Sequence, residues 1–490
     1  MRESLRFVLS QWKQRNKQSS DSFLQKEDEN MISGAIMVPH PPIALKEVGH
    51  GEEKKIQKTL DAYEKAAEFV AQLKPDVLVI TSPHTNGYAD YFNISKGSRA
   101  AGSMAQFNAP QVRFEVDYDT DFVYALEQEA KEAGFPAGSQ YDRPTQLDHG
   151  VMVPLYFIQK YVPNIPIVRI ALSGLPMEKN YELGELIAKA SDRTNKNVVI
   201  VASGDLSHCQ LETGPYGYKP AGPEYDRRIM ADMVAGAFEA LFDYDTAFRQ
   251  EAAECGHGSF AIMAGAFDGH DVKIRELSHE ATFGVGYGVI LFKNEGIDDK
   301  RHFLENRLDK EKAKIDEKIA GSDAYAKLAR ASVKAAVLEA PLELPDDLPE
   351  EMLKNMAGAF VSIHEFDELR GCIGTIAATQ DSVAEEIIKN AWSASQNDPR
   401  FAPIKAEELP YLDISVDILS DAEPIHDKSE LDVKKYGVIV TKGGRRGLLL
   451  PNLDGVDTID QQIEIACRKA GIDPKEPGIQ MERFEVVRHV

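Results

Sequence analysis

The chain has 490 residues, a length that predicts two or three domains rather than one. Its hydrophobic content of 43% and charged content of 28% are those of an ordinary water-soluble globular protein. The formal net charge of −23 argues against nucleic acid or an anionic membrane as the main partner, and the sequence contains no apolar run long enough to span a bilayer. Its four cysteines form no C-x-x-C pair, which argues against a zinc ribbon and a disulfide framework. We therefore expect a cytoplasmic protein.

The first part of the chain is predicted to be a polar tail followed by an α/β domain. Residues 1–30 are polar and charged and lack the apolar core of a secretory signal. Over residues 31–293, strand patterns alternate with helical ones, which predicts a mainly parallel sheet flanked by helices. The expected strands are 76–80, 165–172, 197–202 and 284–292, and the expected helices are 56–70, 226–242 and 259–267.

The second half of the chain has a different pattern. Residues 294–321 are dominated by charges, and we expect them to form a solvated helix that links two domains. Residues 322–490 predict an α+β domain, because runs of strands and helices are separated in the sequence. Its expected helices are 325–338 and 460–470, and its expected strands are 360–363, 411–419, 436–440 and 447–450, the last two forming a hairpin.

Four histidines lie beside short apolar runs in the α/β region. Three follow predicted strands, and the fourth opens an apolar stretch; they are His40, His84, His208 and His149. In open α/β sheets the ligand crevice lies at the carboxyl ends of the strands. Because imidazole is the commonest metal ligand and titrates near neutral pH, this pattern predicts a metal site with an acid–base partner.

His40 and His84 are the expected metal ligands, and the third ligand is open. Two histidines and one carboxylate form the ligand set of non-haem Fe(II) sites that bind substrate and O₂. Glu254 is the best candidate for the carboxylate, since it lies in a loop before an apolar helix. Cys255, the next residue, is the alternative as a thiolate ligand. The sequence does not decide between the two.

His208 and His149 are predicted to act beside the metal. An imidazole suits the base that removes a phenolic proton, and Asp205 is placed three residues before His208, where it could orient the ring. The simpler alternatives are that His149 only caps a helix and that Asp205 is a turn residue. Three further histidines of this region, His257, His270 and His279, are expected to be solvated or locally hydrogen-bonded.

These motifs together resemble the class III extradiol dioxygenases of the LigB type and the related Memo proteins. The motifs are Val38-Pro39-His40-Pro41-Pro42, Ser82-Pro83-His84, Leu147-Asp148-His149-Gly150 and Ser203-Gly204-Asp205-Leu206-Ser207-His208. The resemblance implies Fe(II), or another divalent metal, held by His40, His84 and an acidic residue that maps best to Glu254. It also implies His208 as the base, His149 in the substrate pocket, and a small aromatic compound and O₂ as substrates.

The chain also departs from the dioxygenase pattern at two positions. Memo-like proteins place a cysteine before glycine in the loop of the third ligand, as Cys255 and Gly256 do here. Before the base histidine, Asp205 stands where the dioxygenases carry glycine. Both positions are closer to Memo.

The second domain resembles the AMMECR-type domain. The motifs are Leu369-Arg370-Gly371-Cys372-Ile373-Gly374, Asn397-Asp398-Pro399-Arg400-Phe401 and Ser415-Val416-Asp417-Ile418-Leu419-Ser420. The fusion resembles the AmmeMemoRadiSam system protein A architecture, which implies a radical S-adenosylmethionine enzyme and a Memo-like protein as partners. We also expect a homo-oligomer.

Two features of the second domain have alternative interpretations. Cys372, close to Arg370, is either a reactive thiol or a small buried hydrophobe, and we favour the second. Residues 442–446 form either an anion-binding backbone nest or an exposed hairpin tip, and again we favour the second.

The leading functional hypothesis is an Fe(II)-dependent, ring-opening dioxygenase for a small catechol-like or related aromatic compound. The second is a Memo-like metal or redox accessory protein of a radical enzyme without ring-cleaving turnover. The third is an interaction module in which the AMMECR-type domain acts as an adaptor. The identity of the third ligand separates the first two.

Overall fold

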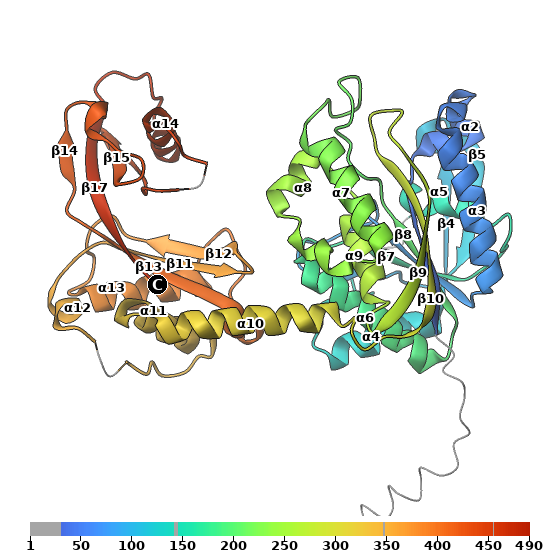
Figure 1. Ribbon diagram of the computed structural model, residues 1–490, viewed down its shortest axis with the longest axis horizontal. Helices are drawn as coiled ribbons and strands as arrows, with labels where there is room; N and C mark the ends of the chain where they lie inside the picture. Colours follow the sequence, from blue (N-terminus) through green and yellow to red (C-terminus); the bar gives the residue numbers. More distant parts are fainter. Residues whose placement is uncertain (1–30, 142–145, 346–347, 454) are drawn as a thin grey trace, which may run out of the picture. The chain divides into compact units, whose positions relative to one another are not determined.

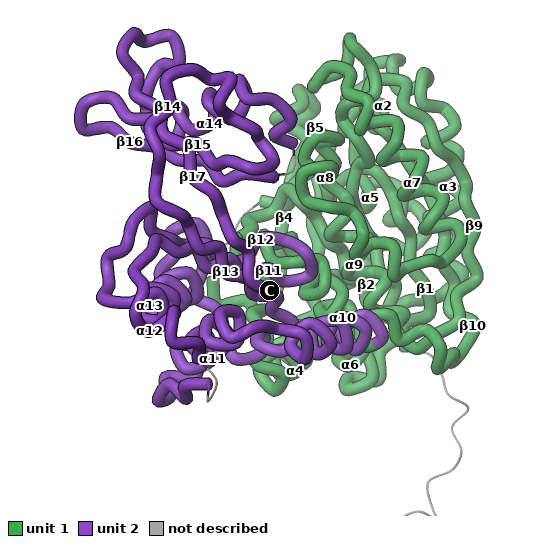
Figure 2. The backbone as a smooth tube through the Cα atoms, turned by 60° about the vertical axis from the view of Figure 1, so that its left-hand side comes forward, with its two compact units in different colours: residues 1–305 green, residues 306–490 purple. Residues whose placement is uncertain are grey.

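A computed structural model describes residues 31–141, 146–345, 348–453 and 455–490. The expected polar tail, residues 1–30, lies outside the described residues. The chain divides into two compact units, with the boundary between Glu305 and Asn306 (Figure 2). We refer to them as unit 1 and unit 2.

Unit 1 is built on a six-stranded sheet in which four neighbouring strands are parallel. Their order is β7 (Ile167–Ala171), β2 (Val77–Ser82), β8 (Val198–Ser203) and β1 (Ile32–Val38). The sheet continues with two antiparallel strands, β10 (Tyr287–Ile297) and β9 (His270–Glu280). This parallel-rich sheet confirms the predicted α/β fold. The sequence reading did not include β9, whose side chains are mostly exposed or half-buried and show no apolar run.

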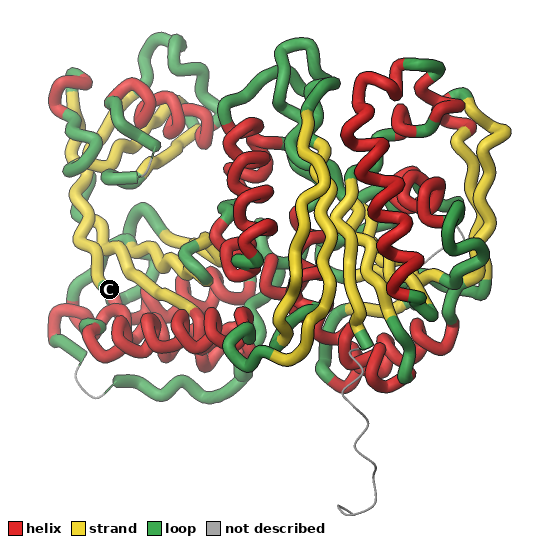
Figure 3. The backbone as a smooth tube through the Cα atoms, turned by 45° about the vertical axis from the view of Figure 1, so that its right-hand side comes forward, coloured by secondary structure: helices red, strands yellow, loops and turns green. Residues whose placement is uncertain are grey.

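Helices cover both sides of this sheet (Figure 3). On one side, α3 (Gln57–Leu73) and α5 (His149–Ile158) pack against alternate residues of the central strands in the main apolar core. Helix α9 (His257–Gly265) also contacts β8, and α6 (Met177–Thr194) packs on α9. Because β2 and β8 are buried along their whole length, they read as continuous apolar runs, as strands buried on both faces do.

The bounds of two predicted helices were wrong. The helix expected over 226–242 is α7 (Ala221–Ala235), which ends at Gly236 in the left-handed conformation with φ of 68°. The helix expected over 294–321 is α10 (Phe303–Gly321), which begins later. Its expected first residues belong to β10, because β10 stays paired with β9 up to Ile297.

Unit 2 contains a seven-stranded antiparallel sheet with its helices grouped apart, as the α+β prediction requires. Along the sheet the strands are β12 (Glu368–Gly374), β11 (Ala359–Glu365), β13 (Leu412–Leu419), β17 (Gln480–His489), β15 (Tyr436–Lys442) and β16 (Arg445–Leu449), while β14 (Glu423–Ile425) pairs with β17. The helices are α11 (Ala324–Val337), α12 (Glu350–Lys354), α13 (Val383–Gln396) and α14 (Ile459–Ala470). Helices α11 and α13 pack on β11 and β13, and α14 packs on β15 and β16, as the labels of Figure 1 allow the reader to follow.

Within the described part of the chain, none of the helices combines the length and apolar character needed to cross a bilayer.

The contact between α6 and α9 depends on glycine and leads to a prediction. A Cβ at Gly265 would lie 1.9 Å from the carbonyl oxygen of Tyr181, so the two helices could not keep their distance. We expect Gly265→Ala to lower the free energy of unfolding by roughly 1–3 kcal/mol, the usual cost of overpacking. Urea unfolding followed by circular dichroism measures this change.

Gly321→Ala in α10 is the matched control, because a Cβ there meets nothing within 4 Å. Equal stability of the Gly265→Ala and Gly321→Ala proteins would contradict the close-packing argument.

Candidate metal centre

The parallel strands of unit 1 deliver the four predicted histidines to one edge of the sheet. His40 follows β1, His84 follows β2, and His208 lies in the loop after β8. His149 is the first residue of α5, whose N-terminus lies beside β2 and β8. The carboxyl ends of parallel strands meet at one edge, which is why residues far apart in sequence come together here.

His40 and His84 form the centre of this group. Their Nε2 atoms are 2.9 Å apart, and their ring centroids lie 4.7 Å apart with the rings nearly perpendicular. His40 is buried, with 1% of its surface exposed, whereas His84 is exposed to solvent. The site therefore has a closed side at His40 and an open side at His84.

The hydrogen bonds of His40 assign its tautomer. Ser203 donates its hydroxyl proton to the carbonyl oxygen of Gly150 at 2.5 Å, so its Oγ acts as an acceptor towards Nδ1 of His40 at 3.0 Å. His40 Nδ1 must then carry the proton, and Nε2 presents a lone pair to the centre. Burial, followed by the nearby His84 and His208, lowers the pKa of His40 well below its usual value. The ring is therefore held neutral, as a metal-ligating imidazole must be.

The sulfur of Cys255 joins the two imidazoles. Its Sγ lies 3.7 Å from Nε2 of His40, and the ligand atoms of His40, His84 and Cys255 all lie within 4.8 Å of one another. The loop reaches this place because Gly204 and Gly256 approach closely: a Cβ at Gly204 would lie 2.1 Å from Cα of Gly256. Burial, with Asp205 and Glu254 nearby, raises the pKa of the Cys255 thiol well above its usual value.

Glu254, the expected carboxylate ligand, does not belong to this cluster. One of its oxygens accepts the backbone N–H of His257 at 2.8 Å, and the other lies 3.6 Å from Nη1 of Arg249. The carboxylate thus serves the N-terminus of α9, where unpaired backbone N–H groups favour an anion. Of the two alternatives that the sequence left open, the structure brings Cys255 to the histidines and turns Glu254 to a helix end.

Asp205 is placed differently from its expected role beside His208. Its Oδ1 accepts the backbone N–H of His40 at 2.7 Å, while its Oδ2 is 3.9 Å from Nε2 of His208, too far for a hydrogen bond. The ring of His208 is instead oriented by the carbonyl oxygen of Ala253, which lies 2.6 Å from Nδ1. Since a carbonyl only accepts, Nδ1 carries the proton and Nε2 is the atom that can receive another.

His149 completes the histidine group as a stacked aromatic surface. Its ring lies 4.0 Å from that of His84, centroid to centroid, at an interplanar angle of 28°, and Phe107 contacts it edge-on at 5.3 Å. Burial, together with His84 and His40, lowers the pKa of His149 to about 3. The N-cap position of α5 is occupied by Asp148, and His149 is the first residue of the helix.

The donor set fits a divalent transition metal. It combines two imidazoles, one with its lone pair directed inward, and a thiol, all of which bind such ions once deprotonated or neutral. Beside it, the Oδ2 atom of Asp148 is buried and has no hydrogen-bond partner among the residues that the structure describes, although Oδ1 accepts from Ser82 at 2.6 Å. An orphaned carboxylate oxygen next to neutral imidazoles is consistent with a site built for a positive charge.

Two residues that hold the loops of the site in place were not predicted from the sequence. The hydroxyl of Tyr63 donates to the carbonyl of Pro39, directly before His40, and its ring stacks on Phe157 at 4.2 Å. Tyr63 lies within the helix predicted over 56–70, and helical spacing alone does not show a hydrogen bond to a distant loop. The second residue is Asp226.

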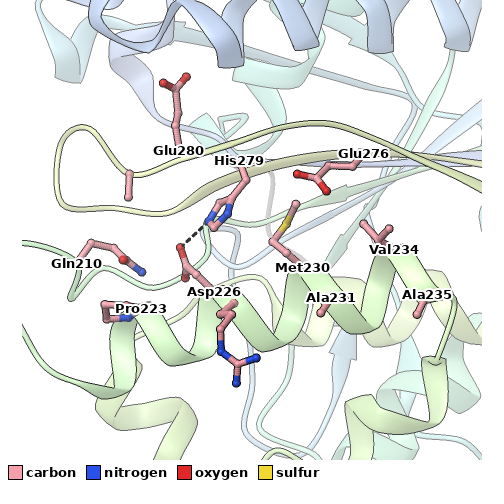
Figure 4. Close-up of a pocket in the computed structure, with 12 residues that line it drawn as sticks. Gln210, Pro223, Asp226, Met230, Ala231, Val234, Ala235, Glu276, His279 and Glu280 are labelled. Atoms are coloured by element: carbon pink, nitrogen blue, oxygen red, sulfur yellow. Dashed lines mark hydrogen bonds and ion pairs between the residues drawn. The ribbon is translucent and has the colours of Figure 1, made fainter.

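Asp226 holds the loop that carries His208 through a backbone hydrogen bond. Its buried carboxylate accepts the backbone N–H of Ser207 at 2.9 Å and lies 3.2 Å from Nε2 of His279. Figure 4 shows this pair at the edge of a cavity of about 600 Å³ between α7 and β9. The hydrogen bond to Asp226 raises the pKa of His279, so this histidine is locally bonded as expected, and in an ion pair.

Comparisons with known proteins cover both units. A family model described as the catalytic LigB subunit of aromatic ring-opening dioxygenase matches residues 34–290, and an AMMECR1 model matches residues 326–489. A protein of Clostridium acetobutylicum is 42% identical over 467 residues, which are 94% of this chain and 99% of that protein. The 2-aminophenol 1,6-dioxygenase beta subunit of a Pseudomonas species is 26% identical over 287 residues, or 53% of this chain and 93% of that subunit.

Among solved structures, an uncharacterized protein of Pyrococcus horikoshii matches with 29% identity and a TM-score of 0.31. The match covers 34% of this chain and 88% of that one.

The contact between Asp226 and Ser207 leads to a prediction about the loop that carries His208. Asp226→Ala leaves the buried N–H of Ser207 without its acceptor, which we expect to cost about 1–3 kcal/mol of unfolding free energy. His279→Gln keeps that contact and should cost less. Urea unfolding of both variants tests this order, and an equal loss in the two would show that the ion pair, rather than the backbone contact, matters.

Proposed function

Because this chain belongs to the LigB family of catalytic subunits of aromatic ring-opening dioxygenases, with an AMMECR1 domain behind it, we propose that unit 1 is a metal-dependent oxygenase. Its proposed reaction is the opening of a small aromatic ring, catechol-like or aminophenol-like, by O₂. The family match confirms the resemblance inferred from the motifs. The observation that carries the proposal is the convergence of His40, His84 and Cys255, with His208 beside them.

His40, His84 and Cys255 would hold the metal, which we propose to be Fe(II). Fe(II) would supply neighbouring coordination positions for a ring hydroxyl or amine and for O₂. The closed side of the site at His40 leaves the approach from the exposed side of His84, so substrate would enter there.

His208 is proposed as the base. Its Nδ1–H is fixed on the carbonyl of Ala253, and its free Nε2 accepts the proton of the substrate hydroxyl. The imidazolium that forms lies 3.9 Å from the carboxylate of Asp205, a distance at which opposite charges still attract. Asp205 therefore stabilises the charged ring without hydrogen-bonding to it.

Aromatic side chains around the histidines suit a flat substrate. His149 presents a ring face backed by Phe107, and Tyr216, which is exposed, meets His208 edge-on with centroids 5.5 Å apart. Offset and edge-to-face contacts of this kind favour an aromatic ligand over an aliphatic one of equal size.

A second candidate function is favoured by one observation, the thiol in place of a carboxylate. A sulfur ligand suits softer metals and one-electron chemistry, which fits a metal or redox accessory protein without ring-opening turnover. On this alternative the partners would be a radical S-adenosylmethionine enzyme and a Memo-like protein.

Metal retention tests the ligand assignment. In anaerobically prepared protein loaded with Fe(II), we expect His84→Ala and Cys255→Ala to lose most of the iron, because each removes one of three donors. Glu254→Gln is the matched control: it keeps a hydrogen-bond acceptor for the N-terminus of α9 and should keep the iron. Iron content by mass spectrometry, with circular dichroism to verify folding, is the readout. Loss of iron in Glu254→Gln with retention in Cys255→Ala would reverse the assignment.

Turnover tests the reaction. O₂ uptake by the iron-loaded protein on a panel of catechols and 2-aminophenol should be measurable, and His208→Ala should retain iron while losing about 10²–10⁴-fold of the rate, the usual contribution of a general base. Iron binding without O₂ uptake on any compound would favour the accessory function. If the wild-type protein binds no iron and His40→Ala behaves like the wild type, both functions are contradicted.

A further inference from the structure

Part of one face of the unit 2 sheet is polar. Across β12, β11 and β13, Ser362 pairs with Cys372 on one side and with Ser415 on the other. The alternate residues point the opposite way, into the apolar core under α11 and α13; Val361 and Val416 belong to that set and are fully buried. Period-two alternation therefore places Cys372 on the face that the core helices do not cover.

Cys372 is held there by its backbone. Its N–H donates to Oδ2 of Asp398 and its carbonyl accepts from Nη2 of Arg400, both at 2.9 Å. Its Sγ lies 3.3 Å from Oγ of Ser362 and is half-buried. The interpretation favoured from the sequence, a small buried hydrophobe, was wrong because the residue lies on the polar side of the strand.

Two arginines lie near this thiol on the same side of the sheet. Arg400 comes from the loop after α13, and Arg488 comes from β17, where it pairs with Asp417. The pKa of each guanidinium is raised, first by its hydrogen bond to an aspartate and further by the nearby Cys372. Both side chains are 52% exposed.

Each of these arginines is held by a buried aspartate. Asp398 and Asp417 have side chains only 2% and 1% exposed, and each accepts from Nε and Nη2 of its arginine. The negative charges are thus covered while the guanidinium groups reach solvent. Among the described residues, Nη1 of Arg400 and of Arg488 has no hydrogen-bond partner, so each arginine keeps N–H donors for a ligand.

We propose that this polar face, defined by Cys372, Ser362, Arg400 and Arg488, binds a small molecule that carries a carboxylate or phosphate group. Guanidinium groups with a fixed orientation and free N–H donors recognise such anions. The same two cations disfavour a metal ion at the thiol. The ligand's anionic group would lie on the free Nη1 donors, and the Sγ atom would face the rest of the ligand. This site is independent of the function proposed for unit 1.

Charge-selective alkylation of the full-length protein tests the site. Iodoacetate and iodoacetamide alkylate a thiol by the same step. The Cys372 sulfur attacks the iodine-bearing carbon, an S–C bond forms, iodide leaves and the thiol proton goes to solvent. Only iodoacetate carries a carboxylate. The quantity measured is the alkylation rate with iodoacetate divided by the rate with iodoacetamide. We expect this ratio to be roughly fivefold higher at Cys372 than at N-acetylcysteine in the same solution, which is the size of effect that a charge pair gives at a partly exposed site. Peptide mass spectrometry separates Cys372 from the other cysteines.

Variants assign the preference to the arginines. Arg400→Gln and Arg488→Gln should each lower the ratio towards that of N-acetylcysteine, whereas Arg488→Lys, which keeps the charge, should retain part of it. Arg468→Gln is the matched control, an exposed arginine of unit 2 that pairs with Glu464 on α14. Circular dichroism shows that a variant is folded, and the ratio of the two rates cancels any effect of a substitution that acts equally on both reagents. A wild-type ratio equal to that of N-acetylcysteine, or a preference that survives in the Arg400→Gln/Arg488→Gln double variant, would overturn the proposal.

Competition identifies the anion. Inorganic phosphate or succinate should slow the labelling of Cys372 by iodoacetate in the wild type but not in Arg400→Gln. Protection by phosphate alone assigns a phosphate-bearing ligand, and protection by succinate alone assigns a carboxylate. Failure of both anions to protect would overturn the binding site.

Discussion

A hydrogen-bond chain through one hydroxyl holds the candidate metal centre together. Ser203, the last residue of β8, accepts from the ring of His40 after β1 and donates to the carbonyl of Gly150 in α5. Three segments separated by more than fifty residues are thereby tied at a single oxygen. The same bonds fix the proton of His40 on Nδ1, so the geometry of the backbone and the chemistry of the ligand are set by one interaction.

The neighbouring aspartate extends this constraint to the loop of Cys255, the proposed third ligand. Asp205 accepts the N–H of His40, while its own N–H lies 3.3 Å from the sulfur of Cys255. The turn Ser203–Asp205 therefore contacts both kinds of proposed ligand, and Gly204 within it allows the backbone of Gly256 to come close. A carboxylate that only oriented His208 would not have to be buried. Asp205 is buried because it contacts His40 and Cys255.

The sequence predicted the parts of this arrangement that strand order determines. His40 and His84 follow buried apolar strands, and parallel strands bring their ends together, so convergence could be expected without coordinates. The choice between Glu254 and Cys255 could not, because side chains of adjacent loop residues point in different directions and the residue types do not show which one faces the centre. The backbone directly before them is left-handed at Ala253, with φ of 52°. Asp226 was missed for a similar reason: its partner, the N–H of Ser207, is a backbone group and leaves no mark in the sequence. In unit 2 the alternation over 411–419 was sufficient to predict β13. The preference for a buried Cys372 was wrong, because in β12 Cys372 shares a face with Arg370 and not with Gly371 and Ile373, which pair with core residues of β11.

The thiol changes what the centre can do without changing its charge. A thiolate and a carboxylate each contribute one negative charge beside two neutral imidazoles, so the attraction for a divalent cation is the same to first order. What differs is softness and reactivity, since sulfur favours softer metals and can itself be oxidised, which a carboxylate cannot. Any oxidant that reaches the centre from the open side at His84 would therefore have two possible targets, the bound substrate and Cys255. Ring-opening turnover requires that the substrate react first, and the contacts of Cys255 with the backbone of Asp205 place its sulfur on the protein side of the site.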